Sequence, residues 1–590
     1  MRAKQWCGCY GWSHKFVKQC VQRELDVACN VRACYIAYAG DSTMFKFYFL
    51  IPPIIALALL RPTFGSKAFA RLGRLVNRIS LRTGRAVAIV GVLSLAICMS
   101  LTLLVRVPPP QVADEFGYLL IGDTLLHGRL SNPVHPLWQH FESIHIIHQP
   151  TYAAKYPPAQ GLALAIGTLV GGHPIVGIWL STALACATMC WMLFAWLPRR
   201  WAFFGGLLIA IHPLILTWSQ SYWGGAVAMG GGALVSGAFR RLVDCRRVRD
   251  AVLMGLGIAI LANSRPYEGF ILTTLMLSAL AVWIFSRHGP DIGFTFRKIV
   301  LPLVLVGGLV AVQIGYYNYR ITGNPLRMPY IVHEETYGVA PLFFWQKPRP
   351  EPVYRHKAIH DLQVNQYLAY FKLQHTWHGF LITTADKIYE LAQGYFWSFL
   401  LLIPLIGLPW ALRYDGWTRF ALLIGSLFTL CMLFGTWVFP HYAAPVMDLF
   451  LVVTIQSIRQ ARLWRWNGKP VGLALTRGII LLCVISVGFI GYRLAQKDEN
   501  RWDFQRARIL QQLENMPGKH VVIVRYSPNH NPHREWIYNA ADIDNAKVIW
   551  AREMSPEENL ELINYFKDRT IWVVDADDPH PQLKPFSPGK

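Results

Sequence analysis

The sequence predicts a mostly α-helical protein, in which a polytopic transmembrane bundle is followed by a small soluble α/β domain. Of its 590 residues, 53% are hydrophobic and only 15% are charged, whereas soluble domains carry about 25% charged residues. Apolar runs close to the ~20 residues that a helix needs to cross a bilayer recur up to residue 492. Beyond that point strands alternate with helices. We therefore expect about 11–13 membrane helices and one C-terminal domain.

Apolar runs mark the expected helices of a membrane domain that spans residues 44–492. The first run, 46–60, is short and is interrupted by Pro52 and Pro53. It fits a membrane helix, a hairpin or a signal-like stretch. The other runs lie at 86–105, 159–172, 174–197, 201–218, 224–239, 251–263, 267–286, 299–316, 395–412, 418–439, 443–458 and 474–492.

Basic residues between the apolar runs predict how the bundle is oriented. The chain has a formal net charge of +23, and residues 61–85 hold seven lysines and arginines without any acid. Further basic clusters lie at 199–200, 240–249, 297–298, 413–419 and 459–469. Because cytoplasmic loops are enriched in lysine and arginine, these segments are expected inside, where they also attract anionic membrane lipid. Such clustering in short loops argues against binding of nucleic acid.

Three regions are then expected on the periplasmic, extracytoplasmic side of the cell's inner (plasma) membrane: loops 107–157 and 317–394, and the tail 493–590. The tail has apolar runs at 520–526, 547–551 and 570–577 and helical patterns near 501–515 and 556–567. Strands that alternate with helices indicate a small parallel sheet. The tail is therefore expected to be an extracytoplasmic α/β domain, of which residues 499–590 fold alone in water.

The first 43 residues differ in composition from the rest of the chain. Five of the eleven cysteines lie within the first 34 residues, but their spacing matches no zinc site. Met44 is followed directly by an apolar run. Two interpretations stay open: residues 1–43 are an extension that precedes the true start at Met44, or they form a redox or metal-binding head.

Two adjacent carboxylates, Asp114 and Glu115, follow the triple proline that comes after the run 86–105. Apolar residues recur after them at helical spacing as far as Gly128, which predicts an amphipathic helix on the outer membrane face. Consecutive helical residues point about 100° apart, so both acids cannot face one site. On spacing alone, they are first-turn acids that complement the helix dipole.

A lysine ends the same loop, because Lys155 and Tyr156 directly precede Pro157 and Pro158 at the next membrane entry. A membrane helix, an acidic pair in a juxtamembrane helix and a Lys–Pro–Pro element, in this order, resemble the GT-C superfamily of membrane glycosyltransferases. The likeness is to the branch of protein O-mannosyltransferases and aminoarabinose transferases, which take sugars from polyprenyl phosphates. It covers about residues 86–460 and implies a GT-C-like helical fold.

The resemblance implies roles for residues of this loop. Asp114, with Glu115 second, matches the acidic motif that supplies the base for the acceptor. Lys155 matches the lysine that contacts the lipid phosphate. Here the sequence departs from the family pattern, because Tyr156 stands between the lysine and the prolines.

Two further pairs of residues are expected to bind substrate. His441 and Tyr442 match a late element of the family in which a basic residue and a tyrosine precede a proline, with histidine here in place of the more usual arginine. Arg265 and Glu268 lie at a helix break inside an apolar region. Ionisable residues within a membrane are costly and mark functional sites by default. A mutual ion pair at the turn is the alternative.

These groups suit transfer of a sugar from a polyprenyl-phosphate donor to a hydroxyl of a glycan, lipid or protein acceptor, with inversion. The departing lipid phosphate, whose second pKa is near ~6, needs the cationic stabilisation that Lys155 and Arg265 could give. The acceptor hydroxyl needs a base, which Asp114 could be. The sequence contains neither a Rossmann fingerprint nor a P-loop, and no cofactor is expected.

A cluster of histidines in the first loop allows a different expectation, a divalent metal site. The five are His127, His135, His140, His145 and His148. In a helix, His145 and His148 would share a face. Solvated histidines in an aromatic-rich loop that contacts sugar are the alternative.

Two other functions stay open. A transporter or lipid flippase would have inverted repeats and paired discontinuous helices, and the chain has one candidate break, at Arg265 and Pro266, without a clear counterpart. A membrane scaffold whose tail binds a partner would keep that binding when Asp114 is replaced.

Overall fold

The structure, a computed structural model, describes residues 51–287, 289–397, 399–496 and 500–586. The expectations for residues 1–43 and for the beginning of the run 46–60 lie outside the described residues. The rest of that run forms α2 (Ile51–Leu60). Ile54 of α2 packs against Gly478 of α22 (Val471–Ala495).

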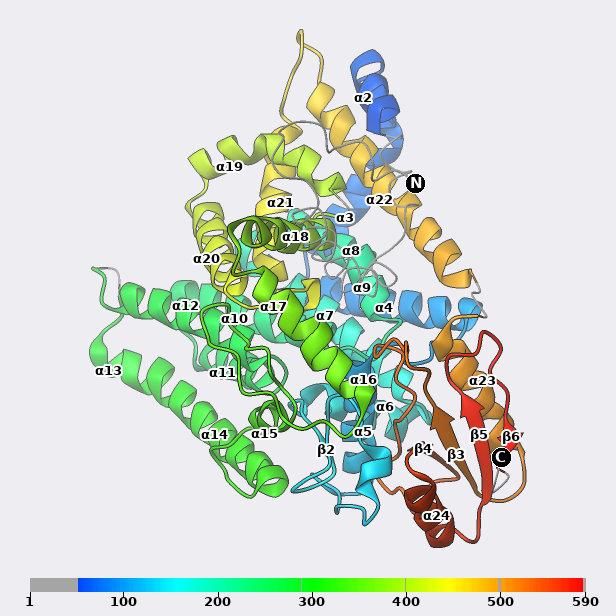
Figure 1. The fold of residues 1–590 in the computed structure, drawn as a ribbon. Coiled ribbons are helices and arrows are strands. Elements are labelled where there is room, and N and C mark those ends of the chain that lie inside the picture. Colours follow the sequence, from blue (N-terminus) through cyan, green and yellow to red (C-terminus); the bar gives the residue numbers. More distant parts are fainter. Residues whose placement is uncertain (1–50, 288, 398, 497–499, 587–590) are drawn as a thin grey trace, which may run out of the picture.

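Helices dominate the chain as far as residue 495, as predicted (Figure 1). Among the described residues, six helices are long and apolar enough to cross a membrane, and a seventh span results if the bent pair Trp377–Tyr395 and Leu400–Tyr414 counts as one. The six are α4 (Thr83–Val105), α7 (Pro174–Trp196), α12 (Pro266–Ile284), the continuous helix Ile292–Thr322, α20 (Gly416–Leu433) and α22. The protein is a multi-pass membrane protein of mostly helical fold.

Other helices complete the bundle. They are α3 (Ser66–Ser80), α6 (Ala159–Gly171), α8 (Arg199–Ala210), α9 (Pro213–Trp218), α10 (Gly225–Cys245), α11 (Val248–Ala262), η5 (Leu400–Gly407), α19 (Leu408–Tyr414), η6 (Pro440–Tyr442), η7 (Ala444–Val446) and α21 (Met447–Ala461). The continuous helix Ile292–Thr322 comprises α13 (Ile292–Thr295), η3 (Phe296–Val300) and α14 (Leu301–Thr322). The predicted run 201–218 is split between α8 and α9, because Pro213 has no N–H with which to continue a helix.

The first predicted loop, residues 329–373 of the second loop and the tail lie together at one end of the bundle, whereas residues 377–395 of the second loop lie higher in this view (Figure 1). The first loop contains α5 (Ala113–Leu126), η2 (Trp138–Phe141), β1 (Ile146–Ile147) and β2 (Ala153–Ala154); the second contains α15 (Pro329–Thr336), α16 (Lys357–His360), η4 (Asp361–Leu368), α17 (Ala369–Leu373) and α18 (Trp377–Tyr395). The Tyr337 hydroxyl donates to Glu142 at 2.7 Å and joins the two loops. The Tyr152 hydroxyl donates to the Asn539 carbonyl at 3.0 Å and joins the first loop to the tail.

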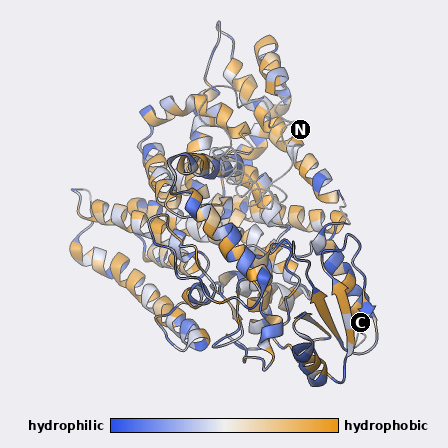
Figure 2. Cartoon of the chain, viewed as in Figure 1, coloured by the Kyte–Doolittle hydropathy of each residue, from blue (hydrophilic) through white to orange (hydrophobic). Residues whose placement is uncertain are grey.

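The tail contains the predicted parallel sheet. Its strand order is β4-β3-β5-β6. The strands β3 (His520–Arg525), β4 (Val548–Arg552) and β5 (Thr570–Asp575) are parallel, and the short β6 (Lys584–Pro585) is antiparallel to β5. The helices of the tail are α23 (Trp502–Asn515) and α24 (Pro556–Tyr565). Figure 2 shows hydrophobic strands beside the mostly hydrophilic α24.

The sheet of the tail has two apolar faces, because side chains alternate across a strand. Val522 and Val524 pack in a core with Leu513 of α23. Val521 on the other face belongs to the same core as Phe116 of α5. Folding of residues 499–590 alone stays a prediction, and this shared core means that the isolated tail would expose the part of this face that α5 covers.

The helix α5 has the predicted bounds but not the predicted surroundings. Gly128, with φ 67, follows its end as expected. Most of α5 is buried, however, because α6 packs on one side of it and the tail on another. The expectation of an amphipathic helix lying on the membrane face is therefore wrong, since the tail covers the surface that would have faced water.

Candidate active site

The first turn of α5 sends its two carboxylates into different surroundings. Val112 is extended and precedes the helix, so that Asp114 and Glu115 both lie in the first turn. Successive helical residues point about 100° apart. The contacts of the two acids differ accordingly, and they are described in turn.

Glu115 is buried and holds the start of α5 in place. One carboxylate oxygen accepts hydrogen bonds from the backbone N–H groups of Gln111 and Val112, and the other accepts one from Tyr222 at 2.8 Å. Burial raises the pKa of Glu115 to about 7, against the opposing effect of these donors. Glu115 therefore fastens α5 to the turn between α9 and α10.

Asp114 remains accessible, with 32% of its side chain exposed. The Tyr156 hydroxyl donates to Asp114 Oδ1 at 2.8 Å, and His145 Nε2 lies 3.9 Å from Oδ2. Burial lowers the pKa of His145 well below its usual value, and the charge of Lys155 lowers it further. Asp114 is thus an accessible carboxylate that a tyrosine orients and a neutral imidazole faces.

Lys155 is buried beside the same tyrosine. Its Nζ lies 5.7 Å from the centre of the Tyr156 ring and 4.8 Å from that of Tyr330. The nearest carboxylate is Glu334 of α15, whose Oε1 lies 3.4 Å from Nζ and 3.2 Å from Nδ1 of His333. Although burial opposes the effect, Lys155 and His333 lower the pKa of Glu334 to about 2. Lys155 is therefore a buried cation balanced by an ionised carboxylate.

A second cation lies at the break between α11 and α12. Arg265 precedes Pro266, the first residue of α12, and its Cζ lies 4.6 Å from the centre of the Tyr442 ring. Glu268 is buried in the first turn of the same helix. The break brings one cation and one carboxylate to the end of the bundle where η6 places Tyr442.

Tyr118 of α5 connects the two cationic groups. Its ring centre lies 4.7 Å from that of Tyr156. Burial raises the pKa of Tyr118 to about 12; Arg265 acts to lower this pKa, and Asp114 and Glu268 act to raise it. Asp114, Glu268 and Arg265 therefore all act electrostatically on one buried phenol.

His441 lies among aromatic rings next to this group. Its ring centre is 4.3 Å from that of Trp223 and 4.6 Å from that of Tyr442. Burial lowers the pKa of His441 well below its usual value, and Arg265 lowers it further. His441 is thus a neutral packing partner of Tyr442.

The structure brings most of the expected residues to one place and adds several. Tyr156 is hydrogen-bonded to Asp114, and its ring centre lies 5.7 Å from Lys155 Nζ, while Glu115 accepts hydrogen bonds from backbone groups. Four side chains that contact these residues were not predicted from the sequence: Tyr118, Tyr330, His333 and Glu334. The available signal was "HEETYG" at 333–338, in which a histidine precedes two acids.

The histidines of the first loop do not form the expected metal site. Residues 146–147 form β1, so His145 and His148 do not share a helical face, and that expectation is wrong. His135 instead contacts the tail, with Nε2 3.2 Å from Asp544 Oδ1. In the part of the chain that the structure describes, no group of three or more His, Cys, Asp or Glu residues could hold a metal ion.

Chemically, the arrangement offers a base and two anion-binding groups. Asp114 can accept a proton, since it is exposed and hydrogen-bonded through one oxygen. Lys155 is a buried cation and Arg265 is a half-buried one, and both can bind or stabilise an anion more strongly than they would in water.

Comparison with solved structures finds membrane glycosyltransferases. An oligosaccharyltransferase from Archaeoglobus fulgidus has a TM-score of 0.45 at 12% identity, covering 82% of this chain and 68% of that chain. ArnT from Cupriavidus metallidurans in the apo state has a TM-score of 0.44 at 11% identity, covering 82% and 93%. No family model and no curated protein matches the sequence. Likenesses of this degree carry no conclusion about activity, which is argued from the site.

Proposed function

We propose that the protein is an integral membrane glycosyltransferase that moves a sugar from a polyprenyl-phosphate donor to a hydroxyl of a glycan, lipid or protein acceptor, with inversion. The observation that supports this most directly is the position of Tyr156. Its hydroxyl donates to Asp114 at 2.8 Å, and Lys155 Nζ lies 5.7 Å from its ring centre. One residue connects an accessible carboxylate with a buried cation.

Asp114 is the general base of this proposal. The acceptor oxygen forms a bond to the anomeric carbon while its proton passes to Asp114. A positioned base of this kind typically contributes about 10² to 10⁴ in rate. Tyr156 fixes one oxygen of the carboxylate by donating to it, which leaves the other oxygen for the acceptor. Attack from the face opposite the leaving group inverts the sugar carbon.

The leaving group is the polyprenyl phosphate. As the bond from the sugar carbon to the phosphate oxygen breaks, its electron pair moves to the phosphate, which gains negative charge. Lys155 and Arg265 stabilise that charge. Because Lys155 is buried and Arg265 is half-buried, their attraction for the phosphate is screened less than at an exposed surface.

When the donor binds, its phosphate competes with Glu334 for Lys155. The Glu334 carboxylate holds Lys155 at 3.4 Å, so an arriving phosphate must share the ammonium with it or displace it. Displacement keeps the charge of Lys155 neutralised before and after binding. It also loosens the tie between α15 and the loop that carries Lys155.

The remaining expected residues shape the site. Tyr442 packs on Arg265 and His441 packs on Tyr442, which keeps the guanidinium in place. Glu268 balances the charge of Arg265 at the helix break. We place this site, both loops and the tail on the extracytoplasmic side of a cytoplasmic (bacterial inner) membrane, in keeping with the basic loops at the other end of the bundle.

Transfer assays with the purified full-length chain in nanodiscs test the proposal. Radiolabelled sugars are offered as polyprenyl phosphates and, separately, as nucleotide sugars, with hydroxyl acceptors from membrane extracts. We expect label to move only from the lipid-linked donor. Activity with nucleotide sugars alone would contradict the proposed donor.

The competing functions give other results in the same preparation. A flippase moves the lipid-linked sugar between leaflets without joining the sugar to an acceptor. A scaffold keeps partner binding when Asp114 is replaced. Reporter fusions at Gly128, Gly338 and Gly518 show on which side of the membrane the two loops and the tail lie. A cytoplasmic signal at Gly128 would contradict the proposed location of the site.

A further inference from the structure

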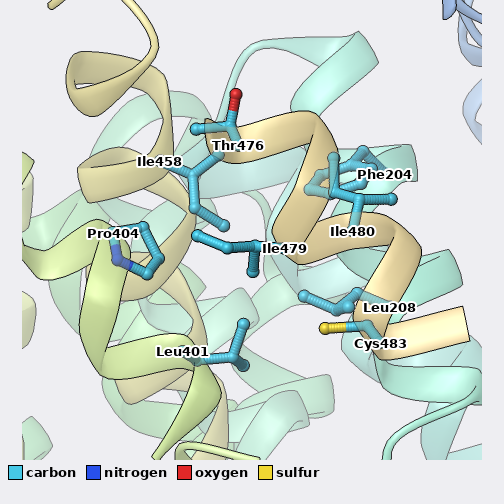
Figure 3. A pocket seen from close by; sticks show the side chains of 9 residues that line it. All are labelled: Phe204, Leu208, Leu401, Pro404, Ile458, Thr476, Ile479, Ile480 and Cys483. Atoms are coloured by element: carbon cyan, nitrogen blue, oxygen red, sulfur yellow. The ribbon is translucent and has the colours of Figure 1, made fainter. Parts of the chain in front are cut away.

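An apolar slot lies in the bundle between four helical elements, α8, η5, α21 and α22. Figure 3 shows its side chains: Phe204, Leu208, Leu401, Pro404, Ile458, Thr476, Ile479, Ile480 and Cys483. None of the described residues that line it is charged. Leu402 and Ile406 of η5 and Leu481 of α22, on the same elements, are exposed. In a membrane these residues meet lipid, so the slot lies beside acyl chains.

Three arginines stand one helical turn from the lining residues. Arg200 lies four residues before Phe204 on α8, Arg462 four residues after Ile458 at the end of α21, and Arg477 three residues before Ile480 on α22. Residues three or four apart lie on the same side of a helix. The three helices therefore each add one arginine near the same slot.

The three helices that carry the arginines pack together, because α21 contacts both α8 and α22. The pKa of Arg462 is lowered by burial and then by the charges of Arg200, Arg459 and Arg477, in keeping with this packing. One of these cations, Arg459, also interacts electrostatically with the carboxylate of Asp415. Concentrated positive charge of this kind favours an anion.

Aromatic rings and a backbone carbonyl orient two of the guanidinium groups. Arg462 Cζ lies 5.4 Å from the centre of the Trp201 ring. Arg477 lies 5.5 Å from the centre of the Phe69 ring, and its Nη1 donates to the Phe64 carbonyl at 2.9 Å. Each guanidinium has further donors, so these contacts leave N–H groups for a ligand.

This region is remote from the candidate active site. The helix α21 begins beside Tyr442 of the site and ends before Arg462. The helix α22 has Arg477 in its first third and the tail beyond its other end. At 1.5 Å per residue, its 25 residues span roughly 37 Å. An anion at the arginines therefore does not compete for the site around Asp114.

We propose that this region binds one anionic phospholipid, whose headgroup phosphate lies on Arg200, Arg462 and Arg477 and whose acyl chain lies over the exposed apolar side chains beside the slot. The charge of the three arginines selects an anionic headgroup over a zwitterionic one. The apolar side chains that follow on the same helices select a lipid over a free phosphate. Exposed Trp464 and Trp466 place this end of the bundle at the level of headgroups, where tryptophan is enriched.

Photo-crosslinking with the full-length protein tests the proposal. Phosphatidylglycerol carrying a diazirine in one acyl chain is incorporated into phosphatidylcholine nanodiscs, and crosslinked peptides are mapped. We expect crosslinks on the α22 segment from Thr476 to Cys483. Replacing Arg200, Arg462 and Arg477 together by glutamine should weaken this binding on the order of 100-fold, at roughly fivefold for each basic residue.

A matched variant separates this site from general attraction to the membrane. Arg247 directly precedes α11, and Arg297 and Lys298 lie in η3 near the start of the continuous helix Ile292–Thr322, at the same end of the bundle. Their joint replacement by glutamine removes the same charge and should leave the crosslinks unchanged. Equal loss in both triple variants, equal labelling by diazirine phosphatidylcholine, or displacement of the lipid by millimolar inorganic phosphate would each overturn the proposal.

Discussion

The two carboxylates at the start of α5 enter different regions of the molecule. Asp114 opens toward the site, where it accepts one hydrogen bond from Tyr156. Glu115 enters a closed region between α5 and the turn before α10, where backbone N–H groups of three residues surround it. The comparison teaches that the direction of the side chain, and not its chemical type, separates a chemical role from a structural one.

Replacing the two acids by their amides gives the largest expected difference. Asp114→Asn keeps the size of the side chain but cannot accept the acceptor's proton, so turnover should fall by about 10² to 10⁴. Glu115→Gln should leave turnover per folded molecule close to that of the wild type. Initial rates of sugar transfer, normalised to folded protein, check both. A greater loss in Glu115→Gln would reverse the comparison.

The cation beside Asp114 gives the next largest effect. Lys155→Ala removes one group that stabilises the departing phosphate, and turnover should fall by about 10² to 10³. Lys155→Arg keeps the charge and should retain part of the activity. Transfer rates measured with the same polyprenyl-phosphate donor check this. Equal activity in the alanine variant would mean that the phosphate is bound elsewhere.

Two adjacent glutamates on α15 sharpen the comparison further. Glu334 contacts Lys155 in the interior, whereas Glu335 pairs with Arg327 at the surface. Glu334→Gln should bind the product polyprenyl phosphate roughly tenfold more tightly, a size typical of coupling between two binding events, because no carboxylate then competes for Lys155. Glu335→Gln is the matched control and should bind as the wild type does. Weaker binding in Glu334→Gln would show that Glu334 only positions Lys155.

Glu115 gives the smallest effect, and it concerns stability. Its amide loses hydrogen bonds to buried backbone groups, which should cost about 1–3 kcal/mol. The raised pKa adds a pH dependence: the fold favours the protonated acid, so the wild type should lose stability as pH rises from the usual 4.5 to about 7. Glu115→Gln should lack this dependence. Thermal unfolding of both proteins in nanodiscs between pH 4.5 and 7.5 checks this difference. If the melting temperatures of the wild type and Glu115→Gln change with pH in parallel, the structural role given to Glu115 is contradicted.

The sequence predicted those parts of the fold that local composition controls. The lengths of the apolar runs predicted helices such as α7 and α22 to within a few residues, and the alternation of strands with helices predicted a small parallel sheet in the tail. Asp114 and Lys155 could be singled out because each lies at a membrane boundary. These features depend on neighbours along the chain, which the sequence displays directly.

Long-range packing could not be predicted in the same way. Glu334 lies 179 residues after Lys155, and nothing in either segment specifies their contact. Likewise, α5 was expected at a water-facing surface, but Tyr538 of the tail stacks on Phe116 at 4.0 Å between ring centres. A sequence shows that such side chains are apolar or charged, but it does not show which distant partner buries them.

Donor binding and transfer measured on one sample of Asp114→Asn test the central claim most directly. The purified full-length variant in nanodiscs is loaded with a radiolabelled polyprenyl-phosphate sugar, its affinity is measured, and a single turnover is then started by adding acceptor. If Asp114 is the base, affinity should match the wild type, because the phosphate is held by Lys155 and Arg265, while transfer slows by at least ~100-fold. Transfer at the wild-type rate from donor bound with unchanged affinity would contradict the account.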